Sequence, residues 1–246
     1  MNCFFKQVRN RVKYGDFDYD PVQFLVLEDR RLILLLPSKV ACTSIKVAVG
    51  KGLGIDYKST SGLDIHSDPR WPKATGGIPK RYQDYFFAAF VRHPFSRLVS
   101  CYQDRVLYTP HGEDFKEYYF QRYPFPIAAN CSFEQFVRVV AKITDPLADR
   151  HFKQQSHSLA KARREPDFLG RFENLAEDWR WLAERFGFPL TLEKLNRTDR
   201  HSHRIASDWR DFYTPALVAR VARRYSQDLN QLGYRDELES FTMRVA

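Results

Sequence analysis

The chain has 246 residues, of which 43% are apolar and 28% are charged, a composition typical of one globular domain and not of a disordered segment. Its formal net charge of +9 predicts attraction to anionic partners such as a nucleotide or an acidic polysaccharide. Its apolar runs are all shorter than the roughly 18 residues that a membrane-spanning helix needs, so an integral membrane segment is not expected.

The positions of the basic residues and the cysteines indicate which partners and which cell compartment to expect. The basic residues are spread along the chain without a long Lys/Arg run or a zinc-finger spacing, so nucleic acid is not the expected partner. Cys3, Cys42, Cys101 and Cys131 show no metal-binding spacing, and no metal is expected. Four cysteines could form two disulfides, but free buried thiols fit a cytosolic protein better. The absence of a secretory signal in residues 1–9 also favours a cytoplasmic protein.

The first elements expected are two strands. Apolar residues 24–27 and 32–36 flank a charged turn at 28–31, a pattern that predicts a hairpin at the entry to a sheet. Residues 51–80 are rich in glycine and proline and have no long apolar period. They are predicted to be loops with a potential role in substrate binding.

A strand-to-helix turn follows the second strand and carries polar side chains. Lys39 adds a mobile positive charge, and Thr43 and Ser44 add hydroxyl donors at the start of the expected helix. Because backbone N–H groups and the helix dipole converge at such a turn, it suits an anion. The Walker A sequence GxxxxGK[ST] is absent. Taken alone, the pattern also fits an ordinary turn.

A second strand-to-helix turn repeats this arrangement. Residues 85–91 form an apolar strand, and Pro94 suits the first turn of the helix that follows. Arg92 ends the strand, while Arg97 and Ser100 fall in the first two helical turns. Since ligands of open α/β sheets collect at the carboxyl ends of strands, two anion sites are expected at one sheet edge. That arrangement suits a ligand with phosphates at both ends.

Three helices are expected in the second half of the chain. Residues 132–140 have a capping-box pattern, and 174–186 form a capped helix with an apolar face that ends at Gly187. A last helix is predicted over 214–232, closed by Gly233. There is no repeat or low-complexity linker, so residues 1–246 are predicted to form a single domain.

Five segments together resemble the PAPS-dependent carbohydrate sulfotransferases (sulfotransferase family 2). Residues 37–44 look like the loop that binds the 5′-phosphosulfate, and 90–100 look like the 3′-phosphate motif. Residues 149–155 and 170–178 resemble the DxHW-type and FEnLxeD segments of the chondroitin and HNK-1 branch. The ending over 212–234 is also of that type.

Two residues depart from the family pattern. Ser38 stands between Pro37 and Lys39, where the family often has proline directly before the lysine. Phe152 stands where the branch usually has tryptophan. Neither change removes a charge, so the cofactor is still expected to be PAPS, but the acceptor sugar stays open.

The resemblance implies a fold, a reaction and partners. The fold would be α/β, a P-loop-like three-layer arrangement with a central parallel sheet flanked by helices. The activity would be transfer of a sulfuryl group from PAPS to a carbohydrate hydroxyl, without a metal, on an acceptor that could be an acidic polysaccharide. Animal members carry an N-terminal membrane anchor that this sequence lacks, which favours a bacterial member. The oligomeric state is open.

The resemblance also implies roles for individual residues. Lys39 would stabilise the charge that grows on the leaving phosphate. Arg92 and Ser100 would bind the 3′-phosphate, and Lys46 is expected at the surface or as a secondary contact. The residues expected around the 5′-phosphate are Ala41, Cys42, Thr43 and Ser44.

A histidine is the default general base near neutral pH. His66 is the first choice, because it lies between the two anion motifs, where related enzymes usually place their base. His151, in the DxHW-like segment, is the competitor, whereas His93 is expected only to pack. Arg204 belongs to a basic loop over 196–204 that could fold over the nucleotide. His111 and His157 have no supporting context, and His201 and His203 belong to the same basic loop.

Two functions of other classes stay open at this stage. One is a P-loop-like kinase that uses ATP and Mg²⁺, against which stand the missing Walker A sequence and the lack of an evident Walker B carboxylate. The other is a non-catalytic module that binds polyanions, with strong salt dependence and no preference for a 3′-phosphorylated nucleotide.

Overall fold

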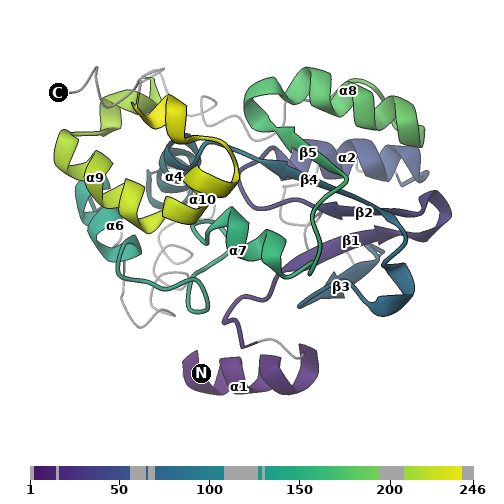
Figure 1. Cartoon of the computed structure of the whole chain (residues 1–246), viewed down its shortest axis with the longest axis horizontal. Helices are drawn as coiled ribbons and strands as arrows, with labels where there is room; N and C mark the ends of the chain where they lie inside the picture. Colours follow the sequence, from purple (N-terminus) through teal and green to yellow (C-terminus); the bar gives the residue numbers. More distant parts are fainter. Residues whose placement is uncertain are drawn as a thin grey trace.

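The architecture is α/β, built on one mixed sheet (Figure 1). The computed structural model describes residues 3–14, 17–55, 65, 70–107, 127–128, 131–193 and 208–239. Within them the strand order is β3-β1-β2-β4-β5. β2, β4 and β5 are parallel, while β1 pairs antiparallel with both β2 and β3. The strands are β1 Gln23–Leu27, β2 Leu32–Leu35, β3 Lys73–Thr75, β4 Phe86–Val91 and β5 Phe168–Arg171. The predicted fold class is confirmed, with a parallel centre extended by two antiparallel strands.

The expected hairpin is present, and the structure adds a strand beside it. β1 and β2 are joined by a short 3₁₀ turn, Glu28–Arg30, after which Arg31 adopts a positive φ of 48°. β3 lies within residues 51–80, where only loops were predicted. It has 3 residues and pairs along the edge with β1. A strand this short has no alternating pattern long enough to detect, so only its pairing with β1 defines it.

Two helices cover one face of the sheet, α2 Cys42–Gly52 and α8 Leu175–Phe186 (Figure 1). Leu34 and Phe90 point from the strands into a buried cluster that includes Ile45 of α2 and Trp179 of α8. Side chains alternate along a strand, so the neighbours of these residues face the opposite side. There Ile33, Phe87 and Ala89 are buried against Tyr82 and Ala162. The sheet is therefore covered on both faces.

A helical layer lies beyond the carboxyl end of the parallel strands (Figure 1). It consists of α4 Pro94–Tyr102, α6 Phe133–Val140, α7 Gln155–Ala160, α9 Pro215–Arg224 and α10 Ser226–Gln231. Other helical pieces are α1 Cys3–Tyr14, η2 Lys80–Tyr82, the π-helical turn η3 Gln103–Leu107, η4 Phe172–Asn174 and η6 Trp209–Phe212. α4, α6, α9 and α10 share a third buried cluster that contains Phe95, Phe136, Val221 and Leu229. In the ranges that the structure describes, no helix combines the length and apolarity needed to cross a membrane.

The predicted helix over 214–232 is divided in two, so that prediction was wrong in part. Thr214 caps α9 through Leu217 N–H as expected, but the helix ends at Tyr225, which has φ −110°. α10 then begins at Ser226 and brings Asp228 under the start of α7. The Tyr225 hydroxyl donates to Phe152 O at 2.8 Å. These tertiary contacts have no local signal in the sequence.

The other two helix predictions are confirmed in their bounds. α6 begins with a full capping box, in which Ser132 and Gln135 exchange side-chain and backbone hydrogen bonds. α8 ends at Gly187, which adopts φ 69° as a left-handed C-cap residue. Its first residue is preceded by Asn174, whose side chain does not cap the helix but bonds to Asp178 instead.

Candidate active site

Three loops meet at one edge of the sheet, after β2, β4 and β5. Because these strands are parallel and in register, their carboxyl ends lie side by side. The loop after β2 carries Lys39, β4 runs directly into Arg92, and β5 ends one residue before Phe172. The sheet therefore brings together the two motifs that the sequence placed at a common edge.

The loop after β2 has an unusual backbone. Lys39 and Ala41 adopt φ values of 74° and 64°, in the left-handed region that non-glycine residues rarely occupy. Ala41 is the N-cap of α2 and has no side chain that could accept from the first N–H groups of the helix. Thr43 and Ser44, both nearly buried, lie in that first turn after Cys42. The helix start thus presents backbone donors and hydroxyls at one place, which suits a phosphate group.

Arg92 connects the two motifs. Its Nη1 donates to Lys39 O at 3.2 Å, and its Nε donates to Ser96 Oγ at 3.0 Å. The guanidinium carbon lies 4.0 Å from the centre of the Phe172 ring. Burial lowers the pKa of Arg92 to about 10, which still leaves it charged at neutral pH. No carboxylate of the described residues forms an ion pair with it, so further N–H donors remain for an anion.

Ser96 and Ser100 are one turn apart in α4, so both side chains lie on the same face of this helix. Ser96 was not predicted as part of the site. Its hydroxyl also donates to His93 O at 3.2 Å, so it fixes Arg92 Nε against the first turn of α4. Ser100 is half-buried. The structure therefore places Ser100 on the face of α4 that carries the contact with Arg92.

The main chain at the end of β4 is held by side chains from distant segments. The Gln155 side-chain amide accepts from Arg92 N–H at 2.9 Å and donates to Arg92 O at 2.8 Å. Glu173 accepts from His93 N–H at 2.7 Å, and its other oxygen accepts from the Tyr234 hydroxyl at 3.0 Å. Asp228, fully buried, accepts from Gln155 N–H at 3.0 Å. The position of Arg92 is thus fixed by its backbone as well as by its side chain.

Arg97 was grouped with the anion sites from the sequence, and the structure assigns it differently. It is only 2% exposed. Its Nε, Nη1 and Nη2 donate to the carbonyl oxygens of Ser38, Lys153 and Arg150 at 2.9, 2.8 and 2.8 Å. All three nitrogen atoms are therefore engaged with main chain. Arg97 holds the loop after β2 against the segment before α7.

Lys39 is the centre of a charged cluster. Its Nζ lies 3.0 Å from Asp104 Oδ2, and Arg105 Nε lies 3.0 Å from the same oxygen. Although burial raises the pKa of Asp104, the positive charges of Lys39 and Arg105 lower it below its ordinary value. Asp104 and Arg105 belong to η3 and were not predicted as site residues from the sequence. Adjacent acidic and basic residues usually mark a solvated face, so no local signal distinguished them.

His151 extends this cluster on the other side of Arg105. Its Nδ1 lies 2.5 Å from Asp149 Oδ1, and its Nε2 lies 2.8 Å from Arg105 Nη2. An arginine only donates, so Nε2 is the acceptor and Nδ1 carries the proton toward Asp149. Burial and the charge of Arg105 lower the pKa of His151, and Asp149 opposes them. His151 is therefore a neutral, oriented imidazole close to Lys39.

The remaining histidines divide into three groups. His93 is packed among Phe95, Trp209 and Tyr234, and burial lowers its pKa to about 4, in agreement with the predicted packing role. His157 pairs with Asp18. His66, His111, His201 and His203 lie outside the described residues, as does Arg204.

Lys46 and two cysteines also lie on the helices of the candidate site. Of the two roles expected for Lys46, the surface position was wrong, because Lys46 is 9% exposed, while the secondary contact stays a prediction. Burial lowers the pKa of Lys46 to about 8. α2 packs closely on the sheet, which encloses even its polar positions. Cys42 and Cys101 are free thiols, and burial raises the pKa of Cys101 to about 12. Among the described residues, no group of histidines, cysteines and carboxylates is arranged to hold a metal ion.

Comparison of the sequence with known proteins places the chain in one family. The model of a "Sulfotransferase family" matches residues 22–235. Carbohydrate sulfotransferase 9 of Homo sapiens is 28% identical over 230 residues, covering 87% of this chain and 50% of the relative. Carbohydrate sulfotransferase 8 of Homo sapiens is 26% identical over 166 residues, covering 63% and 37%. Carbohydrate sulfotransferase 14 of Danio rerio is 26% identical over 179 residues, covering 67% and 48%.

The chain spans about half the length, or less, of these curated relatives. No solved structure matches it significantly. The family match covers all three loops of the candidate site, from the first strand to the last helix.

Proposed function

Because this chain belongs to the sulfotransferase family, we propose that it transfers a sulfuryl group from PAPS to a hydroxyl of a carbohydrate. The observation that supports this most is the contact between the Arg92 guanidinium and the Lys39 carbonyl. It sets two positively charged, donor-rich loops side by side, as a nucleotide with phosphates at both ends requires. The names of the relatives, carbohydrate sulfotransferases, support a sugar as the acceptor.

The residues present fit such a donor. The left-handed turn at Lys39 and Ala41 opens the start of α2, where Cys42, Thr43 and Ser44 would hold the 5′-phosphate. The unused donors of Arg92, with Ser100 on the adjoining helix, would bind the 3′-phosphate. PAPS would supply a sulfate activated as a phosphosulfate anhydride.

Lys39 would act on the charge that develops during transfer. In the reaction one sulfur–oxygen bond to the phosphate breaks and one to the acceptor oxygen forms, so negative charge grows on the departing phosphate. A cation held at that position stabilises the transition state more than the ground state. Asp104 forms an ion pair with the Lys39 ammonium at 3.0 Å. It would orient Lys39 while competing only weakly with a multiply charged phosphate.

His151 would accept the proton that the acceptor hydroxyl loses. Asp149 fixes its tautomer and orientation, as carboxylates commonly do for basic histidines. In the geometry described here Nε2 is occupied by Arg105, so that guanidinium must move before the hydroxyl can bind. His66, the first choice from the sequence, stays the alternative base.

The decisive experiment is transfer of radiolabelled sulfate from PAPS to a panel of glycans, followed by mapping of the labelled position. Label on a sugar oxygen, unaffected by a metal chelator, is the expected result. Label on no glycan, together with tighter Mg²⁺-dependent binding of ATP than of the product PAP, would favour the kinase. Salt-sensitive binding of polyanions without any preference for PAP would favour the non-catalytic module.

A further inference from the structure

A second charged site lies away from the three loops. An open pocket of about 600 Å³ is formed by the turn after α6, the start of α7 and the junction of α9 with α10. We call it the basic pocket, after the side chains that line it: Lys142, Arg220, Arg223 and Arg224. None of the residues proposed to bind the donor lines it. In Figure 1 the elements that supply these residues lie at the left and centre of the view, whereas α8 lies at the upper right.

The charges of the basic pocket are largely uncompensated. Lys142 and Arg223 are exposed and Arg220 is half-buried, and none of the three pairs with a carboxylate in the part of the chain that the structure describes. The acidic lining residue is Asp145, which is already bound by Arg224 at 2.6 Å. Three cations are therefore left to attract an anion.

Asp145 has a second partner, so it is less available to compete with an anionic ligand for the cations of the pocket. The Gln154 N–H and side-chain amide donate to its two oxygens at 2.9 and 2.8 Å. The pKa of Asp145 is lowered, because the Arg224 charge and these hydrogen bonds outweigh its burial. It stays ionised and bound within the wall. Its charge is offset by that of Arg224.

The lining chemistry favours anionic groups over sugar faces. No phenylalanine, tyrosine or tryptophan is among the described residues that line the pocket, and its one histidine, His157, pairs with Asp18. Stacking against a sugar ring is thus not available there, whereas charge-assisted hydrogen bonds from arginine and lysine are. The volume lies in the range of about 300–1,000 Å³ that is usual for small-molecule sites.

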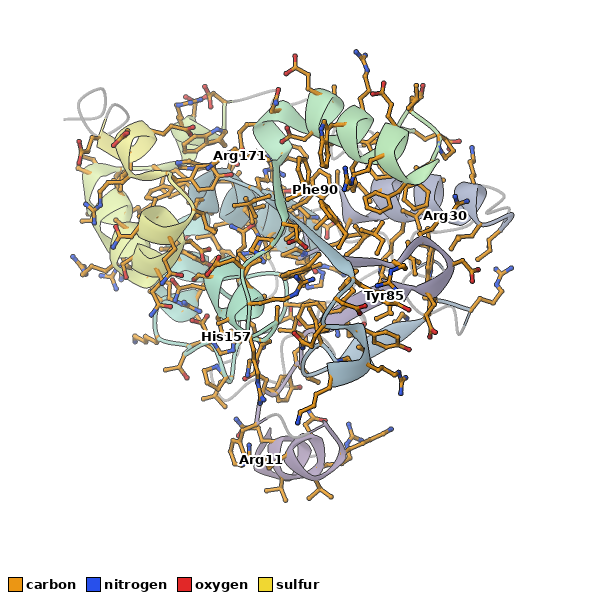
Figure 2. All side chains as sticks on the ribbon, turned by 45° about the vertical axis from the view of Figure 1, so that its right-hand side comes forward. Arg11, Arg30, Tyr85, Phe90, His157 and Arg171 are labelled. Carbon is orange, nitrogen blue, oxygen red and sulfur yellow. The ribbon has the colours of Figure 1, made fainter. Side chains whose placement is uncertain are left out.

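The basic pocket and the proposed donor site share the start of α7. Gln154 lines the pocket, and its neighbour Gln155 binds the main chain of Arg92. Figure 2 shows His157, which also lines the pocket, well separated from Arg171 at the end of β5. The two sites are thus distinct but connected by one short helix.

We propose that the basic pocket binds a carboxylate or sulfate group of an acidic acceptor polysaccharide, away from the hydroxyl that reacts. This inference rests on the proposed function for the identity of the ligand. The net charge of +9 agrees with a polyanionic partner. A chain held at the pocket would be tethered while another of its sugars reaches Lys39.

The test compares two double variants with the same change in charge. Lys142→Glu/Arg223→Glu reverses the pocket, and Lys80→Glu/Arg180→Glu reverses an exposed lysine and arginine on η2 and α8. The probe is a fluorescent chondroitin hexasaccharide, which carries uronate carboxylates, with neutral maltohexaose and a thymidine hexanucleotide as controls. Binding is measured by anisotropy at several salt concentrations, and PAP binding by calorimetry.

The pocket variant should weaken hexasaccharide binding about tenfold relative to the control variant, with a shallower salt dependence and unchanged PAP affinity. Equal weakening by both variants would overturn the inference, as would an equal loss for the hexanucleotide. Lys142→Gln/Arg223→Gln should show a smaller loss in the same direction and covers the case that the charge reversal does not fold. If the unaltered chain transfers no sulfate but the pocket variant still loses hexasaccharide selectively, the pocket stands and the proposed function fails.

Discussion

At the scale of single residues, Arg92 offers a test of how the nucleotide is recognised. Arg92→Ala should weaken PAP binding by roughly 10- to 150-fold, because a charge-assisted hydrogen bond is worth about 1.5–3 kcal/mol. Adenosine 5′-phosphate lacks the 3′-phosphate and should lose little. Calorimetric titration with both nucleotides measures the difference.

Arg92→Lys and Arg180→Ala are the matched controls for this prediction. The lysine keeps the charge but loses the paired donors, so an intermediate affinity for PAP is expected. Arg180 is exposed on α8, and its loss should leave both affinities unchanged. Equal weakening of both nucleotides by Arg92→Ala would show instead that Arg92 acts through the shape of the Lys39 loop.

Lys39 should affect turnover more than binding. Lys39→Ala is expected to lower kcat by about 10²–10³, the usual effect of removing one group that stabilises developing charge. The affinity for PAP, the desulfated product, should change only a few-fold. Single-turnover kinetics with labelled PAPS would separate the two quantities. Normal turnover of Lys39→Ala would show that Lys39 has no part in the mechanism. The control variant Lys39→Arg tests whether a positive charge at a slightly different position is enough for turnover.

The pH dependence tests His151 as the base. Burial and Arg105 lower its pKa below the ordinary 6.5, so the neutral form persists at neutral pH. Activity should then be lost as the pH falls through that lowered pKa, which puts the acid limb of kcat/KM below pH 6.5. Asp149→Asn removes the charge that raises this pKa, so its limb should move to lower pH while kcat falls. If His151→Gln keeps full turnover, the base is another residue, with His66 next in line.

The residues recognised from the sequence are those whose signal is local. Lys39 and Arg92 stand at strand ends, where a run of apolar residues indicates their position. Gln155 could not be found this way, because 63 positions separate it from Arg92. Asp104 and Arg105 likewise acquire a role only when α4 runs on into η3 beside Lys39. The partners of the site are set by tertiary structure, which no spacing rule encodes.

At the scale of elements, the sequence predicted those with strong local patterns. The hairpin of β1 and β2, the capping box of α6 and the glycine end of α8 were each expected with nearly correct bounds. β3 was missed because 3 residues are too few for a pattern. The break between α9 and α10 was missed because Tyr225 continues the apolar spacing, and its contact with Phe152 O lies 73 positions away.

The capping box of α6 gives a prediction about stability. Ser132→Ala removes the acceptor for Gln135 N–H and should lower the free energy of unfolding by about 1 kcal/mol. Glu134→Ala, which removes the exposed pair with Arg138 and a carboxylate at the helix start, should cost about 0.5 kcal/mol. Urea denaturation measures both, and PAP binding should not change. A smaller effect for Ser132 than for Glu134 would contradict the role of the cap.

At the scale of the whole molecule, one buried ion cluster fastens the segment before β1 to α7. Asp18 and Lys153 are each about 2% exposed and lie 2.7 Å apart, while His157 and Lys161 reach the same carboxylate at 2.9 and 3.3 Å. Burial alone would raise the pKa of Asp18, but the hydrogen bonds from His157 and Lys153 hold it well below its ordinary value. The carboxylate is thus charged throughout the physiological range.

Removing Lys153 should therefore be costly. Lys153→Met leaves Asp18 without its closest cation and is expected to lower the free energy of unfolding by about 3 kcal/mol. Lys161→Met, which removes a more exposed and more distant partner, should cost about 1 kcal/mol or less. Denaturation by urea at pH 7 provides both values. The double change Asp18→Asn/Lys153→Met should recover part of the loss, and no recovery would mean that the lysine stem matters more than its charge.

The backbone of the loop after β2 is sterically strained, and residues outside the loop hold it in this conformation. Two left-handed positions that are not glycine, Lys39 and Ala41, lie on either side of Val40 and cost roughly 1–2 kcal/mol each. The carbonyls of Ser38 and Lys39 are held by arginines of the β4–α4 segment, Arg97 and Arg92. A mutational screen that scored nucleotide affinity alone would consequently misassign Arg97 as a ligand, although every nitrogen of its guanidinium faces the protein's own main chain.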